Sequence, residues 1–187
     1  MKVLPLFPSR LFVREDCGLD LKELKEKCLE HQSVQPTVNF SNVGGYQGED
    51  FEYEPLNKLI SNTLTNISDP KRPLKRFQIS SWVNINPPGS YNQVHIHGAY
   101  KFFLTGVFYV QTPTNSGDIC FRDPRGPIGE CCLDEIYFSN GKAEIAKIGP
   151  EPNTLLLFPT WLPHYVERND SEEDRISISF NIFNVEY

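Results

Sequence analysis

The sequence predicts a mainly β fold, a jelly roll with two N-terminal helices packed on one of its sheets. Two observations lead to this prediction. Two amphipathic segments with helix-start signals lie in the first 70 residues. Eight short segments rich in β-branched and aromatic residues follow, separated by clusters of Gly, Pro, Asn and Asp. About eight short strands after two helices favour two packed antiparallel sheets with the helices on one face.

Each helix has its own start signal. Within residues 18–32 apolar side chains recur at helical spacing, Asp20 can cap the start, and Glu23 follows three residues later as in a capping box. The second helix, within residues 54–70, has Pro55 in its first turn, and an Asp-Pro pair ends it. We therefore expect two helices of about four turns each.

The strands are expected wherever a β-rich run lies between two turn signals. They are residues 76–85, 91–97, 102–111, 118–122, 143–149, 153–159, 164–168 and 175–185. The length of 187 residues suits one domain, residues 1–187. In this interpretation residues 1–75 give helical support, and residues 76–187 form the jelly-roll core.

Composition narrows the class of protein. The formal charge of −6 argues against nucleic acid as the main partner, because a basic footprint is missing. No apolar run reaches the length of about 18 residues that a membrane span needs, and the N-terminus does not resemble a signal peptide. The five cysteines are odd in number and lack a C-x-x-C spacing. We interpret them as reduced thiols of a cytoplasmic protein.

The last predicted strand alternates between apolar and polar side chains. One face would carry Ile176, Ile178, Phe180 and Ile182, and the other Arg175, Ser177, Ser179 and Asn181. The polar face holds candidate site residues, so we expect it to look into the mouth of the barrel. A plain solvent face would give the same alternation.

Three of the four histidines form a pattern typical of a metal site. His95 and His97 are two residues apart, so on a strand they share a face and can reach one ion. His164 would join them from another strand or its entry loop. Three neutral imidazoles suit Fe(II), Zn, Ni or Cu. The sequence therefore predicts metal binding by these histidines.

The third ligand has an alternative. Oxygenases often use two histidines and one carboxylate, and His97 stands where the carboxylate is expected. We interpret His97 as a direct ligand. Otherwise an acid, with Asp118 or Asp123 as candidates, would complete the set, and His97 would support a ligand or contact the substrate.

An arginine follows His164 at an informative distance along the sequence. Ten residues separate His164 from Arg175, and Ser177 follows on the same strand face, giving the pattern H-x10-R-x-S. A guanidinium fork suits a carboxylate bidentately, and the serine can add a hydroxyl donor. Together they would hold one end of a short dicarboxylate whose other end reaches the metal. The alternative is a surface ion pair with an acid among residues 172–174.

These residues resemble the Fe(II)- and 2-oxoglutarate-dependent dioxygenases. That superfamily folds as a double-stranded β-helix, a jelly-roll variant, with the signature H-x-D/E, a distal histidine, and an arginine or lysine about ten residues later. The chain is most similar to a small subfamily of 2-oxoglutarate oxygenases, and the similarity covers most of it. The segments that carry the similarity are residues 41–51, 95–126, 155–169 and 175–181.

The resemblance implies an enzyme that uses Fe(II), 2-oxoglutarate and O2. His95, His97 and His164 would be the catalytic metal ligands, and Arg175 with Ser177 would bind the distal carboxylate of 2-oxoglutarate. The cosubstrate would be decarboxylated to succinate, and an unknown substrate, a small molecule or a protein side chain, would be hydroxylated. His97 departs from the family pattern, because a neutral third ligand leaves the site one charge more positive.

A second resemblance points to a different class. Gly89, five residues, and then His95-x-His97 is similar to the start of the cupin motif, and Pro159 with His164 is similar to its second half. The glutamate that cupins place after the second histidine is absent. The alternative function is therefore a cupin-like three-histidine metalloprotein, a dioxygenase, isomerase or binding module that does not use 2-oxoglutarate.

Two further features would shape the pocket. The stretch from Asp123 to Lys142 is longer than a simple turn and is expected to be a rim loop that controls substrate access. Phe108, Phe158 and Trp161 are candidates for apolar walls, although each could equally be an ordinary core residue.

Overall fold

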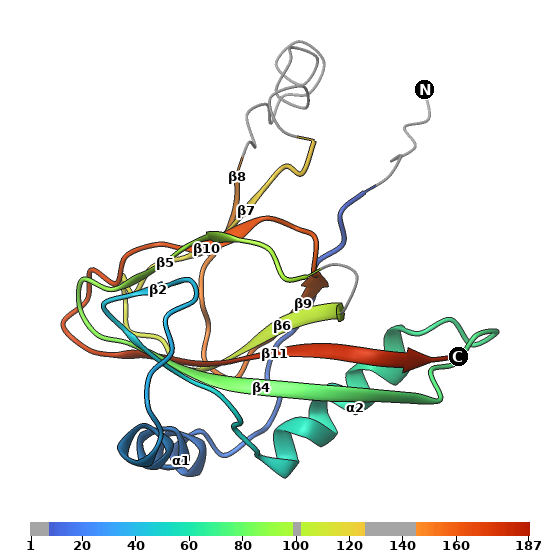
Figure 1. Cartoon of the computed structure of the whole chain (residues 1–187), viewed down its shortest axis with the longest axis horizontal. Coiled ribbons are helices and arrows are strands. Elements are labelled where there is room, and N and C mark those ends of the chain that lie inside the picture. The colour runs from blue at the N-terminus through green and yellow to red at the C-terminus, as the bar shows by residue number, and fades with distance from the viewer. Residues whose placement is uncertain (1–7, 99–101, 126–144) are drawn as a thin grey trace.

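Two antiparallel sheets face each other in the computed structural model, which describes residues 8–98, 102–125 and 145–187 (Figure 1). The larger sheet has six strands in the order β1-β9-β6-β11-β4-β3, and the smaller has five in the order β2-β5-β10-β7-β8. This is the arrangement predicted for a jelly roll. The bounds are β1 Phe12–Arg14, β2 Asn42–Val43, β3 Tyr46–Gly48, β4 Arg76–Asn86, β5 Tyr91–His95, β6 Phe102–Gln111, β7 Ile119–Arg122, β8 Ile145–Ile148, β9 Leu155–Pro159, β10 His164–Val166 and β11 Arg175–Glu186.

Both predicted helices are present, as α1 (Leu21–Val34) and α2 (Glu54–Ile67). Asp20 caps α1 as expected, because its Oδ1 accepts hydrogen bonds from the second and third N–H groups of the helix, each at 3.0 Å. Glu23 has a different role from the one a capping box assigns. Its Oε2 accepts a hydrogen bond of 3.1 Å from the Tyr53 hydroxyl, which ties α1 to the residue before α2.

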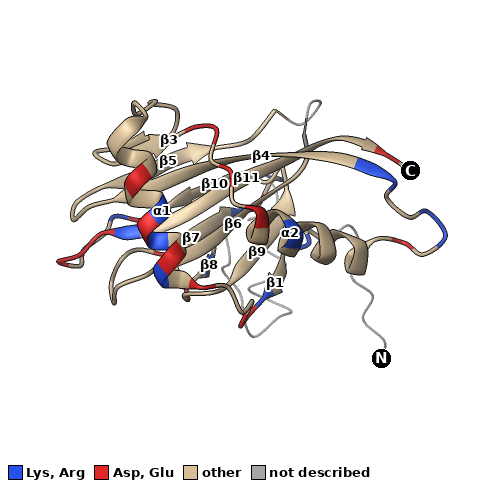
Figure 2. Cartoon of the chain, turned by 90° about the horizontal axis from the view of Figure 1, so that it is seen from below, with Lys and Arg blue, Asp and Glu red and all other residues tan. Residues whose placement is uncertain are grey.

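The helices cover the outer face of the larger sheet, as predicted (Figures 1 and 2). Leu24 and Cys28 of α1 and the apolar stripe of α2 are buried against β4, β6, β9 and β11 in one cluster. A second, smaller cluster lies between the two sheets and is built from β6, β7 and β9. The larger sheet is therefore buried on both faces, so its strands position any site that opens between the sheets.

All eight predicted strands are confirmed, as β4 to β11. Three strands were not predicted: β1, β2 and β3, each of two or three residues. They exist because of pairing with distant partners, such as Phe12 with Leu157 and Gln47 with Asn84. Strand β3 is the edge strand beside β4, which brings residues 46–48 to the wall of the inter-sheet space.

The alternation predicted for the last strand is confirmed. Strand β11 buries its apolar side chains in the core beneath the helices and turns its polar side chains toward the space between the sheets. The apolar set is Ile176, Ile178, Phe180 and Ile182, and the polar set is Arg175, Ser177, Ser179 and Asn181. The polar face of the strand is therefore an interior wall and not a solvent face.

Gly106 lies where β6 passes between β9 and β11, and replacement by alanine is expected to destabilise the fold. An added Cβ would lie 2.3 Å from the Leu156 carbonyl oxygen and 2.5 Å from Cζ of Phe180. Overpacking of this kind costs about 1–3 kcal/mol, and here one neighbour is backbone. Urea unfolding of Gly106→Ala measures the loss. Gly149→Ala, where the nearest atom would be 3.8 Å away, is the matched control and should unfold like the wild type.

Part of two sequence predictions lies outside the described residues. Most of the expected rim loop falls in residues 126–144, and two of the five cysteines, Cys131 and Cys132, fall there as well. The other three, Cys17, Cys28 and Cys120, are free thiols. Among the described residues, no helix is both long enough and apolar enough to cross a membrane.

Candidate functional site

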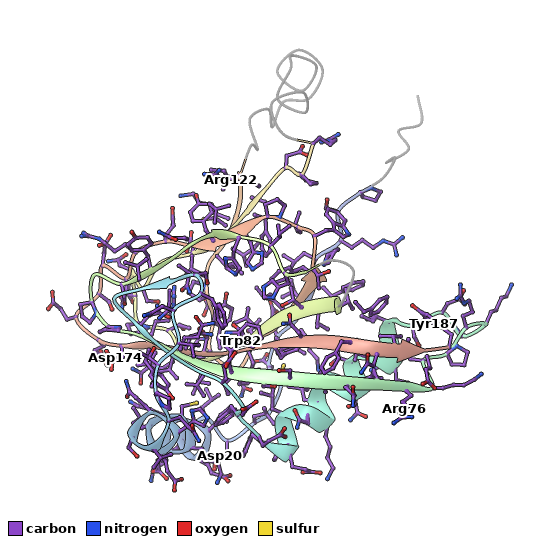
Figure 3. The ribbon with its side chains drawn as sticks, in the orientation of Figure 1. Asp20, Arg76, Trp82, Arg122, Asp174 and Tyr187 are labelled. Carbon is purple, nitrogen blue, oxygen red and sulfur yellow. The ribbon has the colours of Figure 1, made fainter. Side chains whose placement is uncertain are left out.

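A cavity of about 660 Å³ opens between the two sheets. The smaller sheet contributes the histidines to it, and the larger sheet contributes the polar face of β11 and the neighbouring positions of β4 and β6. Trp82 of β4 lies between the sheets, whereas Arg76 and Tyr187 lie at the far end of the β4–β11 pair (Figure 3). The structure thus brings the predicted histidines, Arg175 and Ser177 to one cavity.

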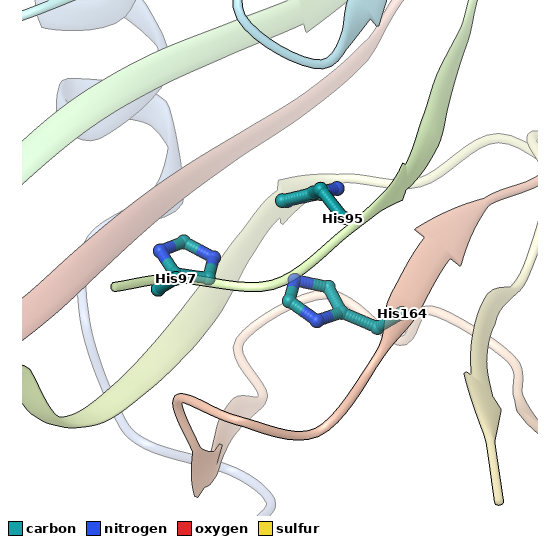
Figure 4. A group of neighbouring side chains, drawn as sticks. All are labelled: His95, His97 and His164. Carbon is teal, nitrogen blue, oxygen red and sulfur yellow. The ribbon is translucent and has the colours of Figure 1, made fainter. Parts of the chain in front are cut away.

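His95 and His164 meet across a strand pair. His95 ends β5, His164 begins β10, and the two are direct partners in the antiparallel register. The centroids of their rings are 4.3 Å apart (Figure 4). In each ring Nδ1 lies by a backbone carbonyl, 2.7 Å from that of Gln93 and 2.8 Å from that of Leu162. A carbonyl only accepts, so Nδ1 carries the proton and Nε2 keeps a free lone pair.

A β-bulge in β5 helps to aim the first of these rings. The register pairs His164 with His95 but Val166 with Asn92, so two residues of β5 oppose a single residue of β10. The extra residue lets both Asn92 and His95, three positions apart, face the cavity. It also places the Gln93 carbonyl against the His95 ring. The bulge is therefore part of the site.

His97 lies two residues beyond His95, where β5 ends. Its backbone N–H donates to the Thr160 carbonyl at 3.0 Å, which continues the contact between the two chain segments. Its ring is parallel to that of His164 within 6°, with centroids 5.2 Å apart. The centroid of the Trp82 ring is 5.8 Å from that of His97. The shared face predicted for His95 and His97 is confirmed, although the strand ends at the first of them.

The three rings form one donor group. The potential ligand atoms of His95, His97 and His164 all lie within 4.8 Å of one another. Burial lowers the pKa of all three, to about 4 for His97 and about 3 for His164. The imidazoles are therefore neutral at pH 7, the form that binds a metal. This donor set fits Fe(II).

The same pKa values predict how acid affects the metal-free protein. His97 and His164 protonate near pH 6.5 when unfolded but only near pH 4 or below in the folded state, so the unfolded state binds more protons between these limits. The free energy of unfolding should therefore fall as the pH drops from about 6.5 to about 4. Urea titrations across this range measure it. His164→Asn should show a shallower fall, and an identical slope would contradict the assignment.

Arg175 begins β11 and is 2% exposed. Its Nη1 donates to the carbonyls of Ser116 and Gly117, at 3.1 and 3.3 Å, whereas its buried Nε has no partner among the described residues. No described carboxylate forms an ion pair with it, so the alternative of a surface ion pair is wrong. Burial lowers its pKa to about 10, so it remains a cation at pH 7. An unpaired buried cation requires an anionic partner.

Several cavity residues were missed by the sequence analysis. Tyr109 of β6 lies opposite Ser177 in the register and beside Arg175, and burial raises the pKa of its hydroxyl. Trp82 faces His97, and Gln47 of the edge strand β3 also lines the cavity. These positions follow from strand pairing, and no local motif marks them.

The alternative metal ligands do not join the histidines. Asp123 is hydrogen-bonded to Arg125, which lowers the pKa of its carboxyl group. Neither Asp123 nor Asp118 is among the described residues that line the cavity. In the described part of the chain, the one group of three or more potential metal ligands consists of histidines alone.

The expected apolar walls are only partly correct. Phe158 does line the cavity, and its ring packs edge-on against His164 at 4.8 Å. Phe108 points to the opposite face of the sheet and is buried in the core beneath the helices. Trp161 is 44% exposed and lines a separate groove with Phe103 and Tyr187. Alternation along β6 turns the side chain of Val107, and not that of Phe108, into the cavity.

Comparison with known protein families agrees with this geometry. Residues 80–181, more than half of the chain, match the family described as "Putative 2OG-Fe(II) oxygenase", and the chain belongs to this family. The matched segment contains all three histidines, Arg175 and Ser177. The protein is therefore a member of the 2-oxoglutarate-dependent oxygenases, which use Fe(II) and O2. A comparison with curated protein sequences found no match.

Solved structures share the fold at low sequence identity. A prolyl hydroxylase from Trichoplax adhaerens, in complex with a peptide of hypoxia inducible factor, superposes with a TM-score of 0.67 at 15% identity, over 93% of this chain and 83% of that one. A prolyl-4-hydroxylase from Pseudomonas putida gives 0.61 at 13%, over 94% and 92%. HygX from Streptomyces hygroscopicus, with nickel and 2-oxoglutarate bound, gives 0.60 at 12%, over 94% and 83%. These likenesses support the double-stranded β-helix.

Proposed function

We propose that His95, His97 and His164 hold the Fe(II) of this oxygenase as three neutral ligands. The proposal is supported by the donor group described above and by the two backbone carbonyls that fix the tautomers of His95 and His164. The side chain of Asn181 lies next to His97, and its buried Oδ1 has no partner among the described residues. It is placed to accept the remaining ring N–H of His97.

Arg175 and Ser177 bind the distal carboxylate of 2-oxoglutarate in this proposal. The single observation that carries the proposed function is the buried guanidinium of Arg175, whose hydrogen-bond partners among the described residues are neutral carbonyls. A dicarboxylate that chelates the metal would bring a carboxylate to this cation. Tyr109 lies beside the same guanidinium and can donate its hydroxyl, which burial keeps protonated.

When bound, the iron supplies the oxidative chemistry, in which 2-oxoglutarate is decarboxylated to succinate and an oxygen atom is delivered to the substrate. The chain's own residues orient the cosubstrate and exclude water. Phe158, Val107 and Ile119 line the cavity with apolar surface on the side of His164. Arg175 fixes the cosubstrate from the opposite sheet. In this proposal Arg175 on the larger sheet binds the charged cosubstrate, and the apolar residues near His164 exclude water.

The substrate is a small molecule or a protein side chain. Fold neighbours include a prolyl hydroxylase complexed with a peptide and HygX complexed with hygromycin B. A cytoplasmic location is supported by the free thiols of Cys17, Cys28 and Cys120.

Anaerobic titration with Fe(II) and then 2-oxoglutarate, followed by visible absorbance, tests the proposed function. A metal-to-ligand charge-transfer band that requires both additions is expected. Iron binding without a band at saturating 2-oxoglutarate would contradict the proposal and favour a cupin-like metalloprotein.

Substitution of His97 tests the third ligand. His97→Asp is expected to keep or improve Fe(II) affinity, because a carboxylate is the usual ligand at this position. His97→Leu should weaken it by at least roughly tenfold, since a donor is lost. Anaerobic Fe(II) binding isotherms measure both. Wild-type affinity in the leucine variant would show that His97 does not coordinate the metal.

A further inference from the structure

The cavity wall has a second polar surface, away from Arg175. Strand β3 is at the edge of the larger sheet, two strands from β11 and thus roughly 10 Å to the side of it. Gln47 of β3 and Glu49 just beyond it both line the cavity. Among the described lining residues, Glu49 is the only carboxylate and Arg175 the only cation. The two charges therefore occupy separate parts of the cavity wall.

Gln47 and Glu49 both offer hydrogen-bond acceptors to a ligand. Gln47 is 5% exposed, and its Oε1 is buried without a hydrogen-bond partner among the described residues. Glu49 is exposed at the cavity wall and forms no ion pair within the described part of the chain. A buried amide oxygen that lacks a donor is costly, so a ligand with N–H groups would satisfy it.

An aromatic ring links this surface to the metal group. The register pairs Gln47 with Asn84 and Gly48 with Val83, where β3 ends. Glu49 and Trp82 are the next residues of the two segments, and both line the cavity. The Trp82 ring in turn lies 5.8 Å from that of His97. Indole is the side chain whose face attracts cations most strongly. A cation bound between Glu49 and Trp82 would therefore lie directly beside the histidines.

We propose that the substrate of this oxygenase carries an ammonium or guanidinium group, which Glu49, Gln47 and the face of Trp82 bind. The proposal rests on the proposed function, because it assigns the substrate class of that same cavity. With Arg175 committed to the cosubstrate, the rest of the described wall offers acceptors, an aromatic face and one negative charge. Among the described lining residues, an acidic substrate would meet Glu49 and find no cation besides Arg175.

Fluorescence of Trp82 provides a direct test. The chain has two tryptophans, so Trp161→Phe leaves Trp82 as the sole indole reporter. The probes are n-butylammonium, 1-butanol and butyrate, which match in size and differ in charge, added to the Fe(II) and 2-oxoglutarate complex without oxygen. We expect saturable binding of n-butylammonium at least tenfold tighter than that of either other probe.

Variants of this polar surface sharpen this test. Glu49→Gln should weaken n-butylammonium binding about threefold to tenfold, and Gln47→Leu should also weaken it. Glu151→Gln, which removes an exposed acid outside the cavity, is the matched control and should bind like the parent. Circular dichroism checks that each variant is folded. Equal or tighter binding of butyrate or butanol, no binding of any probe, or no effect of Glu49→Gln would overturn the proposal.

A further probe distinguishes two sources of the cation. Tighter binding of Nα-acetyl-lysine methylamide than of n-butylammonium would assign the group to a peptide side chain, and weaker binding to a free amine. The charge-transfer band separates this proposal from the proposed function. A charge-transfer band without binding of the cationic probes would contradict only the proposed substrate class. Absence of the band would contradict the proposed cosubstrate site, whether or not the amine binds.

Discussion

Arg175→Ala is expected to weaken 2-oxoglutarate binding by roughly 30-fold to 5,000-fold, the range for removal of one partner of a buried charge pair. The guanidinium is 2% exposed and has no carboxylate partner in the described protein, so the bound cosubstrate would supply its counter-charge. Iron affinity should not change, because the arginine lies on the sheet opposite His95 and His164. Titration of the charge-transfer band with 2-oxoglutarate, at saturating Fe(II) without oxygen, gives the dissociation constant.

Two companion variants make the result specific. Arg175→Lys keeps the charge but loses the planar fork, so its affinity should fall between those of the wild type and the alanine variant. Arg122→Ala removes an exposed arginine of β7 that lies over the Tyr165 ring, away from the cavity (Figure 3), and should leave the constant unchanged. An unaltered constant in Arg175→Ala would remove the assigned role of the arginine.

The second large effect is expected from His164→Ala, which should abolish stable Fe(II) binding. His164 is 4% exposed, is the cross-strand partner of His95, and has its tautomer fixed by the Leu162 carbonyl. Removal leaves two donors on one strand end, too few to retain a labile divalent ion. Iron content after anaerobic desalting, measured by mass spectrometry, should drop from stoichiometric to near background.

The fourth histidine supplies the control. His31 lies on α1, where its Nδ1 is 2.9 Å from the Tyr46 hydroxyl, and it is not part of the metal-binding group. His31→Gln should keep the full iron content. Full iron content in His164→Ala would mean that the ligand assignment is wrong.

The strands that could be predicted are those whose chemistry is local. Strand β11 alternates between apolar and polar residues because one face meets an apolar core and the other a polar cavity. The start of α1 is indicated by its capping residue, Asp20. Strands β1, β2 and β3 are too short to show a period, and only their pairing with distant strands creates them. Strand β6 could be found but not oriented. Both of its faces are buried, so apolar residues occupy successive positions, and the sequence left open whether Phe108 faces the cavity or the core.

The candidate site was predictable where spacing along one strand carries chemistry. The H-x-H pair and the H-x10-R-x-S pattern need only strand periodicity to indicate a metal beside an anion. Trp82, Tyr109 and Gln47 could not be found this way. They join the cavity because β3, β4 and β6 are aligned by the register of the folded sheet, which the sequence alone does not specify. The wall that would select the substrate is thus the part least visible in the sequence.

The two halves of the site belong to different layers of the molecule. His95 and His164 lie on the smaller sheet, whereas Arg175 lies on the larger one that the helices brace. A 2-oxoglutarate molecule bound to the metal at one end and to Arg175 at the other would link the two sheets. Because a ligand that binds only the closed arrangement stabilises it by mass action, loading would suppress independent opening of the smaller sheet. The cosubstrate would then stabilise the contact between the two sheets as well as take part in the reaction. Each turnover would remove this stabilisation, and binding of the next cosubstrate would restore it.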